Sequence, residues 1–520
     1  MTREPPALTV EAVVSPSAAG VLARTDLDRL GDRVSAGLAG LLNALGVPGR
    51  PVVRVRSGDR PARPGQPVRL VVGDVRCRYP DSLPARIAEA DSGVRDGDAT
   101  LPAESLANLC VEAVRRQPGV LVGLPQAQAY AEDLGGERPD PDWLRQVLAG
   151  VLDLRVSVSR RSLVAEILGE AGPDPTTARE ALVARLRPET LDIQLAPDYL
   201  RELFTRDLVP VAGQGLFARL RDIMFEELGM RLPPFRLVPA AHLGPCRIAF
   251  KINDLAGHPV LGLSPGTVLL SEPAGQVHAL GFDATPARNP ATSQEACVVA
   301  EDVSRANDLD GVTPLTYLVL ELAAVLRRHA DCLIDVTGTG RLLDLLEYLY
   351  PALRAAVPQS PAEVTSILRG LVAEGVPISN LRRITGRLVD AGDEFLAEVP
   401  VAGRLPEFVR LGMRRELARS NSWQPGTAAV YALDPQIETS LSASAGSDLD
   451  RAADAVLDLL SHSIDANWTQ VLLTSPEVRP RLARLLRAEL PHLRVLSYDE
   501  VDPQFDAVVL ERLSLLSSAG

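Results

Sequence analysis

The residues whose types and spacing most suggest chemistry are Thr337-Gly338-Thr339-Gly340-Arg341, which stand before a helical pattern. Glycines at a helix start let backbone N–H groups approach a phosphate, so this stretch could form a nucleotide-binding turn. A Walker loop also needs the sequence Gly-x4-Gly-Lys, yet Lys251, the only lysine in the chain, lies in a strand-like stretch. We therefore favour a glycine-rich helix start with Thr339 as its capping residue. A nucleotide-dependent regulator stays the alternative.

No other reactive side chains form a recognisable catalytic or metal-binding set. Ser475 and Ser497 lie outside any Gly-x-Ser-x-Gly elbow, and Ser475 suits a helix cap. Asp499 and Glu500 are adjacent, so on a strand they would point to opposite faces, and we predict that both are solvated. None of the histidines has HExxH spacing or a cysteine partner in a zinc-site pattern; they are His242, His258, His278, His329, His462 and His492. We predict no catalytic residue, no cofactor-binding residue and no metal site, and therefore no enzyme.

One basic group has two interpretations. Arg327, Arg328 and His329 stand just before Asp331 and could form an anion-binding corner. Positive side chains are also favourable at the carboxyl end of a helix, where the helix dipole is negative. We favour a helix C-terminus at this position.

Composition restricts the class of protein. The chain has 520 residues, of which 46% are hydrophobic and only 4% aromatic, enough for several domains with aliphatic cores. A net charge of −13 argues against a nucleic-acid partner. Five cysteines without a CxxC pair indicate a reducing compartment. Because no signal peptide or membrane-length apolar run is found, we expect a cytoplasmic protein without direct membrane insertion.

The same order of predicted elements occurs twice along the chain. Strand 7–14 and helix 27–45 lead into Leu45-Gly46…Pro51, and Leu228-Gly229…Pro234 has the same internal spacing. Arg115-Arg116 with Leu121 likewise matches Arg327-Arg328 with Leu333. We therefore predict tandem diverged copies of an α/β domain plus a helical domain.

The last part of the chain has a different pattern. Residues 471–501 read as strand, helix and strand, with Pro476 at the first helical position after Ser475. Alternating strands and helices predict a small C-terminal α/β domain with a mostly parallel sheet. The predicted fold class is thus mixed α/β and α, in several domains. The boundaries are 1–103 and 104–188 for the first copy, 189–312 and 313–398 for the second, with an inserted subdomain at about 258–310, and 399–520 for the last domain.

Several long segments resemble the FHIPEP family of export-gate proteins. Residues 471–501 are similar to the end of its cytoplasmic region. The sequences ELGMRLPPFRLV (227–238), LELAAVLRRHADCL (320–333) and SILRGLVAEGVPISNLRRITGRLVD (366–390) resemble further family segments, in family order. The family also has a transmembrane part, which we do not find, and Thr313-Pro314 replaces its Asp-Pro.

The resemblance implies a soluble, non-enzymatic scaffold or adaptor related to type III secretion and flagellar protein export. Such a platform docks chaperone-like or substrate-like protein partners in clefts between domains and self-assembles. The implied partner surface lies where the insertion meets its host domain and the helical domain. The alternative is an accessory export component that is recruited to a separate membrane partner.

Overall fold

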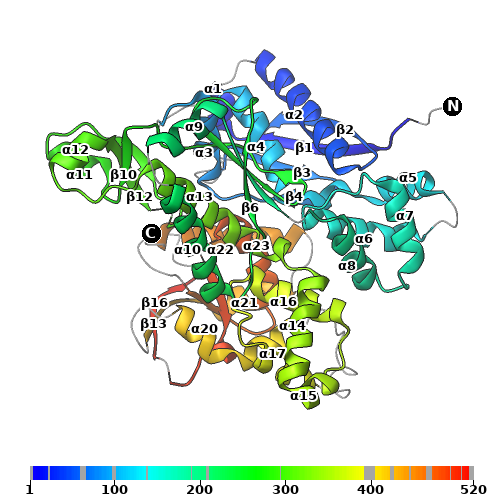
Figure 1. Cartoon of the computed structure of the whole chain (residues 1–520). Coiled ribbons are helices and arrows are strands. Elements are labelled where there is room, and N and C mark those ends of the chain that lie inside the picture. The colour runs from blue at the N-terminus through cyan, green and yellow to red at the C-terminus, as the bar shows by residue number, and fades with distance from the viewer. Residues whose placement is uncertain are drawn as a thin grey trace. The chain divides into compact units, whose positions relative to one another are not determined.

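The computed structural model describes fourteen stretches of the chain, coloured by residue number in Figure 1. They are residues 4–21, 24–58, 66–95, 101–135, 139–188, 190–206, 210–292, 294–391, 405–421, 427–443, 447–463, 471–491, 493–504 and 506–514. The chain divides into two compact units. Unit 1 comprises Met1–Met224 and Arg231–Val336, and unit 2 comprises Phe225–Met230 and Thr337–Gly520.

The first sheet of unit 1 is built from the beginning of the chain. Its order is β2 (Arg50–Ser57), β1 (Ala7–Val14), β3 (Val68–Val72) and β4 (Val75–Cys77). Strand β1 runs parallel to β2 and antiparallel to β3. Helix α2 (Arg24–Leu45) packs on β2 because its leucines recur at helical spacing and form one buried stripe.

The second sheet of unit 1 has the same order and the same strand directions. It runs β6 (Phe235–Pro239), β5 (Leu191–Leu195), β7 (Arg247–Ile252) and β8 (Leu255–Ala256), and β9 (Val260–Leu261) pairs with β7. Strand β5 is parallel to β6 and antiparallel to β7. The short turns β3–β4 and β7–β8 share a left-handed residue as well, Gly73 in the first and Asn253 in the second.

Two glycines end corresponding helices in the same way. Gly46, with φ +76°, follows α2, and Gly229, with φ +74°, follows α10 (Pro210–Leu228). The Val158 amide donates to the Leu45 carbonyl at 2.9 Å, and the Ile378 amide donates to the Leu228 carbonyl at the same distance. Each helix end is therefore tied to a segment more than a hundred residues further along the chain.

The other described helices before residue 392 form two sets. Those before the second sheet are α1 (Pro16–Val21), α3 (Leu83–Ser92), α4 (Ala103–Arg115), η1 (Pro118–Leu121), α5 (Leu124–Leu134), α6 (Pro141–Asp153), α7 (Arg161–Glu170) and α8 (Pro175–Leu186). Besides α10, those after β5 and outside the inserted sheet are α9 (Pro197–Arg206), α13 (Pro314–Arg328), η2 (Ala330–Leu333), α14 (Val336–Leu349), α15 (Pro351–Ala356), α16 (Pro361–Ala373) and α17 (Leu381–Asp390).

A small antiparallel sheet interrupts the second α/β region. Its order is β10 (Thr267–Leu270), β12 (Glu295–Ala300) and β11 (Thr285–Arg288), and α11 (Ala274–Ala279) and α12 (Glu301–Ala306) pack on it. Figure 1 shows this group as a lobe at the left of the view. It has a core of its own, which includes Val268, Leu270 and Cys297.

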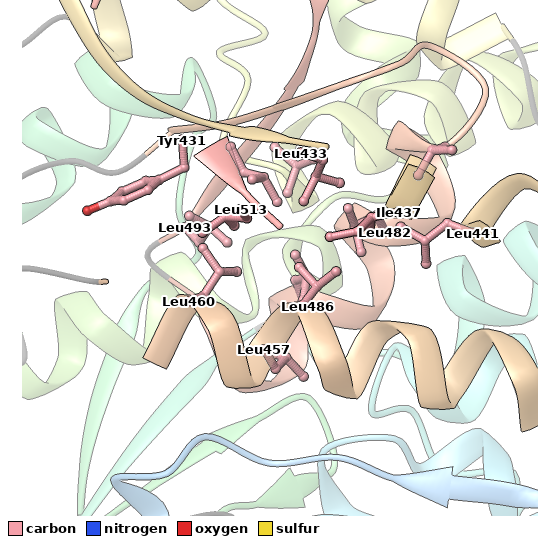
Figure 2. Packing of buried hydrophobic residues seen from close by; sticks show 14 of the residues in the cluster. Tyr431, Leu433, Ile437, Leu441, Leu457, Leu460, Leu482, Leu486, Leu493 and Leu513 are labelled. Carbon is pink, nitrogen blue, oxygen red and sulfur yellow. The ribbon is translucent and has the colours of Figure 1, made fainter. Parts of the chain in front are cut away.

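The C-terminal sheet of unit 2 is parallel throughout, as the sequence predicts. Its order is β15 (Arg494–Ser497), β14 (Val471–Thr474), β13 (Thr427–Leu433) and β16 (Asp506–Leu513). The described helices around it are α19 (Leu405–Gly412), α20 (Arg414–Asn421), α21 (Pro435–Ala443), α22 (Ser447–Ser463) and α23 (Arg479–Glu489). Figure 2 shows leucines from α22 and α23 meeting in the core.

The predicted start of helix α23 is wrong. Helix α23 begins at Arg479, three residues later than Pro476, and Ser475 makes no side-chain cap. Instead the Ser475 carbonyl accepts the Arg479 amide in a turn, and Pro480 occupies the first helical turn. Proline suits that position because its missing N–H has no helical partner there.

Across the described stretches, no helix is both long enough and apolar enough to cross a membrane.

Candidate docking surface

The stretch from Thr337 to Arg341 lies inside a helix. Helix α14 begins at Val336, so Gly338 and Gly340 are part of its first turns. Thr339 is buried, and its hydroxyl has no hydrogen-bond partner among the described atoms. The prediction that Thr339 caps the helix is therefore wrong, because the helix starts before it.

The basic group at the end of α13 follows the favoured interpretation. The helix ends at Arg328, and His329 leads into η2. Burial and the neighbouring charge of Arg116 lower the pKa of Arg328 to about 9.

No group of three or more potential metal ligands occurs within the described stretches, while His492 lies outside them. Cys77, Cys110, Cys297 and Cys332 are buried thiols. Burial raises the pKa of Cys77 and of Cys110 to about 12, which leaves these thiols protonated and unreactive at neutral pH.

Unit 2 contains a buried ionic network that the sequence did not reveal. Arg479 on α23 donates to Glu374, at 2.5 Å, and to Glu407 on α19, with Nε–Oε2 at 2.7 Å. Arg410 lies 2.9 Å from Glu374 and 2.5 Å from Glu500. The Arg479, Arg410 and Glu500 side chains are each 3% exposed or less. The network connects the end of α16, helix α19, helix α23 and the turn after β15.

The prediction that Glu500 is solvated is wrong. Residues Tyr498–Glu500 form a 3₁₀ turn, η4, and not a continued strand. The turn brings the carboxylate back to the Ser497 amide at 2.9 Å and places it against Arg410. Burial alone would raise the pKa of the nearby Glu374, but Arg410 and Arg479 hold it below its ordinary value.

Large apolar side chains are exposed on α14 in unit 2. Tyr348 is 84% exposed, and Leu345 and Leu349 are each 55% exposed. Tyr350 continues the patch and lies 4.8 Å from the Arg382 guanidinium. Contiguous exposed apolar side chains are typical of protein-binding surfaces.

In unit 1, the junction between the inserted sheet and its host is the surface at which the resemblance places partner docking. The chain enters the insertion through β9 and Gly262, and leaves it just before α13. Helix α3, from the beginning of the chain, packs against β9. The predicted surface is thus in contact with another part of the same chain.

Two arginines attach this helix to the junction. Arg86 on α3 lies 2.7 Å from the Glu321 carboxylate on α13. Arg95, three residues after α3, donates to the Leu261 and Gly262 carbonyls at 2.7 and 3.0 Å. Its guanidinium also lies 5.3 Å from the ring centre of Tyr317. Neither arginine lies in a motif, so the sequence offered no signal for them.

A third arginine, which belongs to the second sheet, donates to α3. Arg247 on β7 donates from Nη2 to the Asp91 carbonyl at 2.7 Å, and from Nε to the Ala90 carbonyl. These carbonyls belong to the last turn of α3, which has no helical partners for them. A Cβ atom on Gly244 would lie 1.7 Å from Arg247 Nη1, so glycine leaves the room that this side chain needs.

Beside this contact lies a cavity of about 520 Å³. Helices α2 and α4 line one side of it, through Arg33 and Arg115, and the second sheet lines the other through Gln194. His258, also in the lining, is held by Asp91 at 3.1 Å and by Glu112, which accepts its backbone amide at 2.9 Å.

The comparisons with known proteins agree with this architecture. A model of the FHIPEP family matches residues 211–506, more than half of the chain. The Low calcium response locus protein D of Yersinia pestis is 26% identical over 327 residues, which cover 59% of this chain and 46% of that protein. The flagellar biosynthesis protein FlhA of Bacillus subtilis (strain 168) is 26% identical over 397 residues, which cover 68% of this chain and 54% of that protein.

Solved structures show the same fold. The CdsV protein of Chlamydia pneumoniae matches with a TM-score of 0.54 at 22% identity and covers 62% of this chain and 98% of that chain. The structure of the CdsV and CdsO protein complex from the same organism matches with the same TM-score. The resemblance inferred from residues 227–238, 320–333, 366–390 and 471–501 is thereby confirmed.

Proposed function

Because the chain belongs to the FHIPEP family, we propose that it is a non-enzymatic scaffold that docks protein partners on surfaces between its modules. The relatives include a flagellar biosynthesis protein, FlhA, and a hypersensitivity response secretion protein, HrcV. The chain spans about half the length of the curated relatives that it matches, so a role in export is itself part of the proposal. The expected compartment is the cytoplasm.

The observation that carries the scaffold role is the apolar patch on α14. Leu345, Tyr348 and Leu349 place three large side chains in solvent on one helix, at a net cost unless a partner covers them. The host–insertion junction in unit 1 is the second docking surface, and the family resemblance supports it.

The arrangement in two copies supports a scaffold with repeated modules. We interpret residues 1–188 as a diverged copy of residues 189–398, followed by a C-terminal domain from 399. The shared strand order and the matched helix ends at Gly46 and Gly229 support this interpretation. The domain boundaries given above remain proposals on the same basis.

An accessory role in protein export is the second candidate. It is favoured by the complex of CdsV with CdsO, in which a protein of this fold binds a second protein. In this role the chain would be recruited to a separate membrane partner.

The test uses the full chain as bait in extract from its native host. Recovered proteins are identified, purified and titrated against wild type and against the double variant Tyr348→Ser, Leu349→Ser. We expect at least tenfold weaker binding by the double variant at unchanged melting temperature, because both side chains are exposed. Leu280→Ser, on the inserted lobe and 66% exposed, is the matched control and should bind as wild type does.

Several outcomes decide between the candidates. Recovery of membrane export components favours the accessory role, and recovery of soluble proteins favours the general scaffold. If no purified protein binds the chain directly, the scaffold role is wrong. Light scattering tests self-assembly, and a strict monomer would contradict an oligomeric platform. A melting-temperature increase with ATP or GTP would support the nucleotide alternative.

A further inference from the structure

The segment formed by α3 and Arg95 packs against α4 in its own half of the chain and against β9 in the second α/β region. Ser105 and Asn108 of α4 also donate to Asp91. Its apolar side includes Leu83, Ile87 and Ala90, all buried. Polar contacts hold the segment in place. Arg86 and Arg95 bind groups at the junction, and Arg247 donates to a carbonyl at the C-terminus of α3. Glu89 also lies close enough to Arg288, on the inserted strand β11, for the two charges to interact. The segment therefore contacts the host, and its Glu89 interacts electrostatically with the insertion.

The surface beneath the segment is specific for a guanidinium group. Glu321 is 2% exposed, and Tyr317 donates to it from the phenol at 3.1 Å. Burial, followed by the charge of Glu321, raises the pKa of Tyr317 to about 12, so the phenol keeps its proton at neutral pH. Two main-chain carbonyls, of Leu261 and Gly262, complete the set of acceptors. Each of these groups accepts from an arginine of the segment: Glu321 accepts from Arg86 at 2.7 Å, and the Tyr317 phenol oxygen accepts from Arg95 Nη1 at 3.4 Å.

We propose that α3 and Arg95 are a built-in occupant of the docking surface at the host–insertion junction, and that an external protein reaches this surface by presenting an arginine-bearing amphipathic helix that displaces α3. This inference rests on the proposed docking function of the same surface. A buried carboxylate that loses its ion-pair partner is strongly unfavourable, so displacement of α3 is favoured when another cation takes the place of Arg86. The partner must therefore supply the guanidinium group itself.

Because α3 is part of the same chain as the surface, it stays bound there in preference to a free peptide. A segment linked to its own surface acts at an effective concentration of about millimolar. A free copy of the same segment therefore competes poorly against wild type. It binds well once the tethered copy has lost its arginines.

The experiment uses the full chain and a fluorescent peptide of its own residues 80–95, PDSLPARIAEADSGVR. In anisotropy titrations, wild type should bind the peptide at least tenfold more weakly than the variant Arg86→Ala, Arg95→Ala. Arg201→Ala removes an exposed arginine in the same unit and should behave as wild type does. A peptide that lacks both arginines should not bind the double variant.

Two results would overturn the proposal. One is equal peptide binding by wild type and the double variant. The other is no binding by a double variant whose circular dichroism and melting profile show a folded protein. If the double variant does not fold, hydrogen exchange on wild type replaces it. Excess peptide should then accelerate exchange of the α3 amides, and unchanged exchange contradicts the proposal.

The peptide titration needs no external protein. Its outcome therefore separates this inference from the scaffold role. If the peptide binds as expected and no external partner is found, occupancy by α3 stands and docking of other proteins does not.

Discussion

Buried charges are the residue-scale feature that most distinguishes this chain. Arg479 is fully enclosed, and its two carboxylate partners come from two other helical segments. A buried ion pair adds little net stability over an apolar replacement, because desolvation costs about as much as the attraction returns. Loss of only one partner, however, leaves a buried charge without compensation.

The variant Arg479→Ala should lower the free energy of unfolding of unit 2 by about 3–5 kcal/mol, because it leaves Glu374 and Glu407 without this cation. Urea unfolding followed by circular dichroism measures the change. Arg484→Ala, an exposed position on the same helix, should change it by less than about 0.5 kcal/mol. Equal effects of the two variants would show that the network is not what holds this part of the chain together.

Glu112 gives unit 1 a predictable response to acid. Burial would raise the pKa of this carboxyl, but Arg116, Arg115 and Arg155 together with the His258 amide hold it below its ordinary value of 4.5. The unfolded chain therefore takes up the proton first, at higher pH than the folded chain does. The stabilisation is present above about pH 4.5 and is lost as the pH falls through the lower, folded-state pKa.

Glu112→Gln should accordingly reduce stability at pH 7 and flatten its fall between about pH 5 and pH 3. Melting temperatures across this range provide the measurement. Glu104→Gln, an exposed glutamate on the same helix, should keep the slope of wild type. A wild-type slope in Glu112→Gln would mean that this carboxyl does not carry the acid response.

At the scale of elements, the two α/β regions share a left-handed glycine directly after a helix. A Cβ atom on Gly46 would lie 2.4 Å from the Ser159 Cα, and one on Gly229 would lie 2.2 Å from the Ser379 amide nitrogen. Both glycines also adopt a left-handed backbone conformation, which L side chains rarely adopt. Helix α2 and helix α10 can therefore approach their partner segments only with glycine at this position.

Gly46→Ala and Gly229→Ala should each destabilise the fold by about 2–4 kcal/mol, the sum of backbone strain and a clash with main-chain atoms. Gly40→Ala and Gly215→Ala are matched controls on the same two helices, since a Cβ atom meets nothing within 4 Å there. The controls should be neutral or slightly stabilising, because alanine favours helix. Chemical denaturation measures all four, and a mild effect at only one of the two glycines would weaken the proposed correspondence.

For the whole molecule, the division into two compact units predicts separate responses to mutation. Gly46 belongs to unit 1 and Gly229 to unit 2. Calorimetry of wild type should show two unfolding transitions. Gly46→Ala should lower the temperature of one, and Gly229→Ala the temperature of the other. A single transition that both variants shift equally would show that the units unfold as one.

Local patterns were enough to determine several elements and the fold of the last domain. The leucines of α2 recur at helical spacing, and the short apolar run Val471–Thr474 before a helix indicated a parallel strand. Such signals lie within one element, where periodicity reflects the geometry of the chain itself. The order of long segments likewise determined the family. The predicted first residue of α23 and the predicted capping role of Thr339 were wrong, since both depend on the residues that surround each helix.

Only the tertiary structure decided where the charges lie and what covers the junction. Arg479 and Glu374 are 105 positions apart, and Arg95 and Leu261 are 166 positions apart. Sequence periodicity does not relate residues at such separations. The pattern of an amphipathic helix predicts that its arginines are exposed, and only the fold shows which of them lie against a carboxylate of another element. The sequence by itself therefore determined the elements, the parallel C-terminal sheet and the family. Packing between distant segments decided the buried network in unit 2 and the position of α3 against the host–insertion junction.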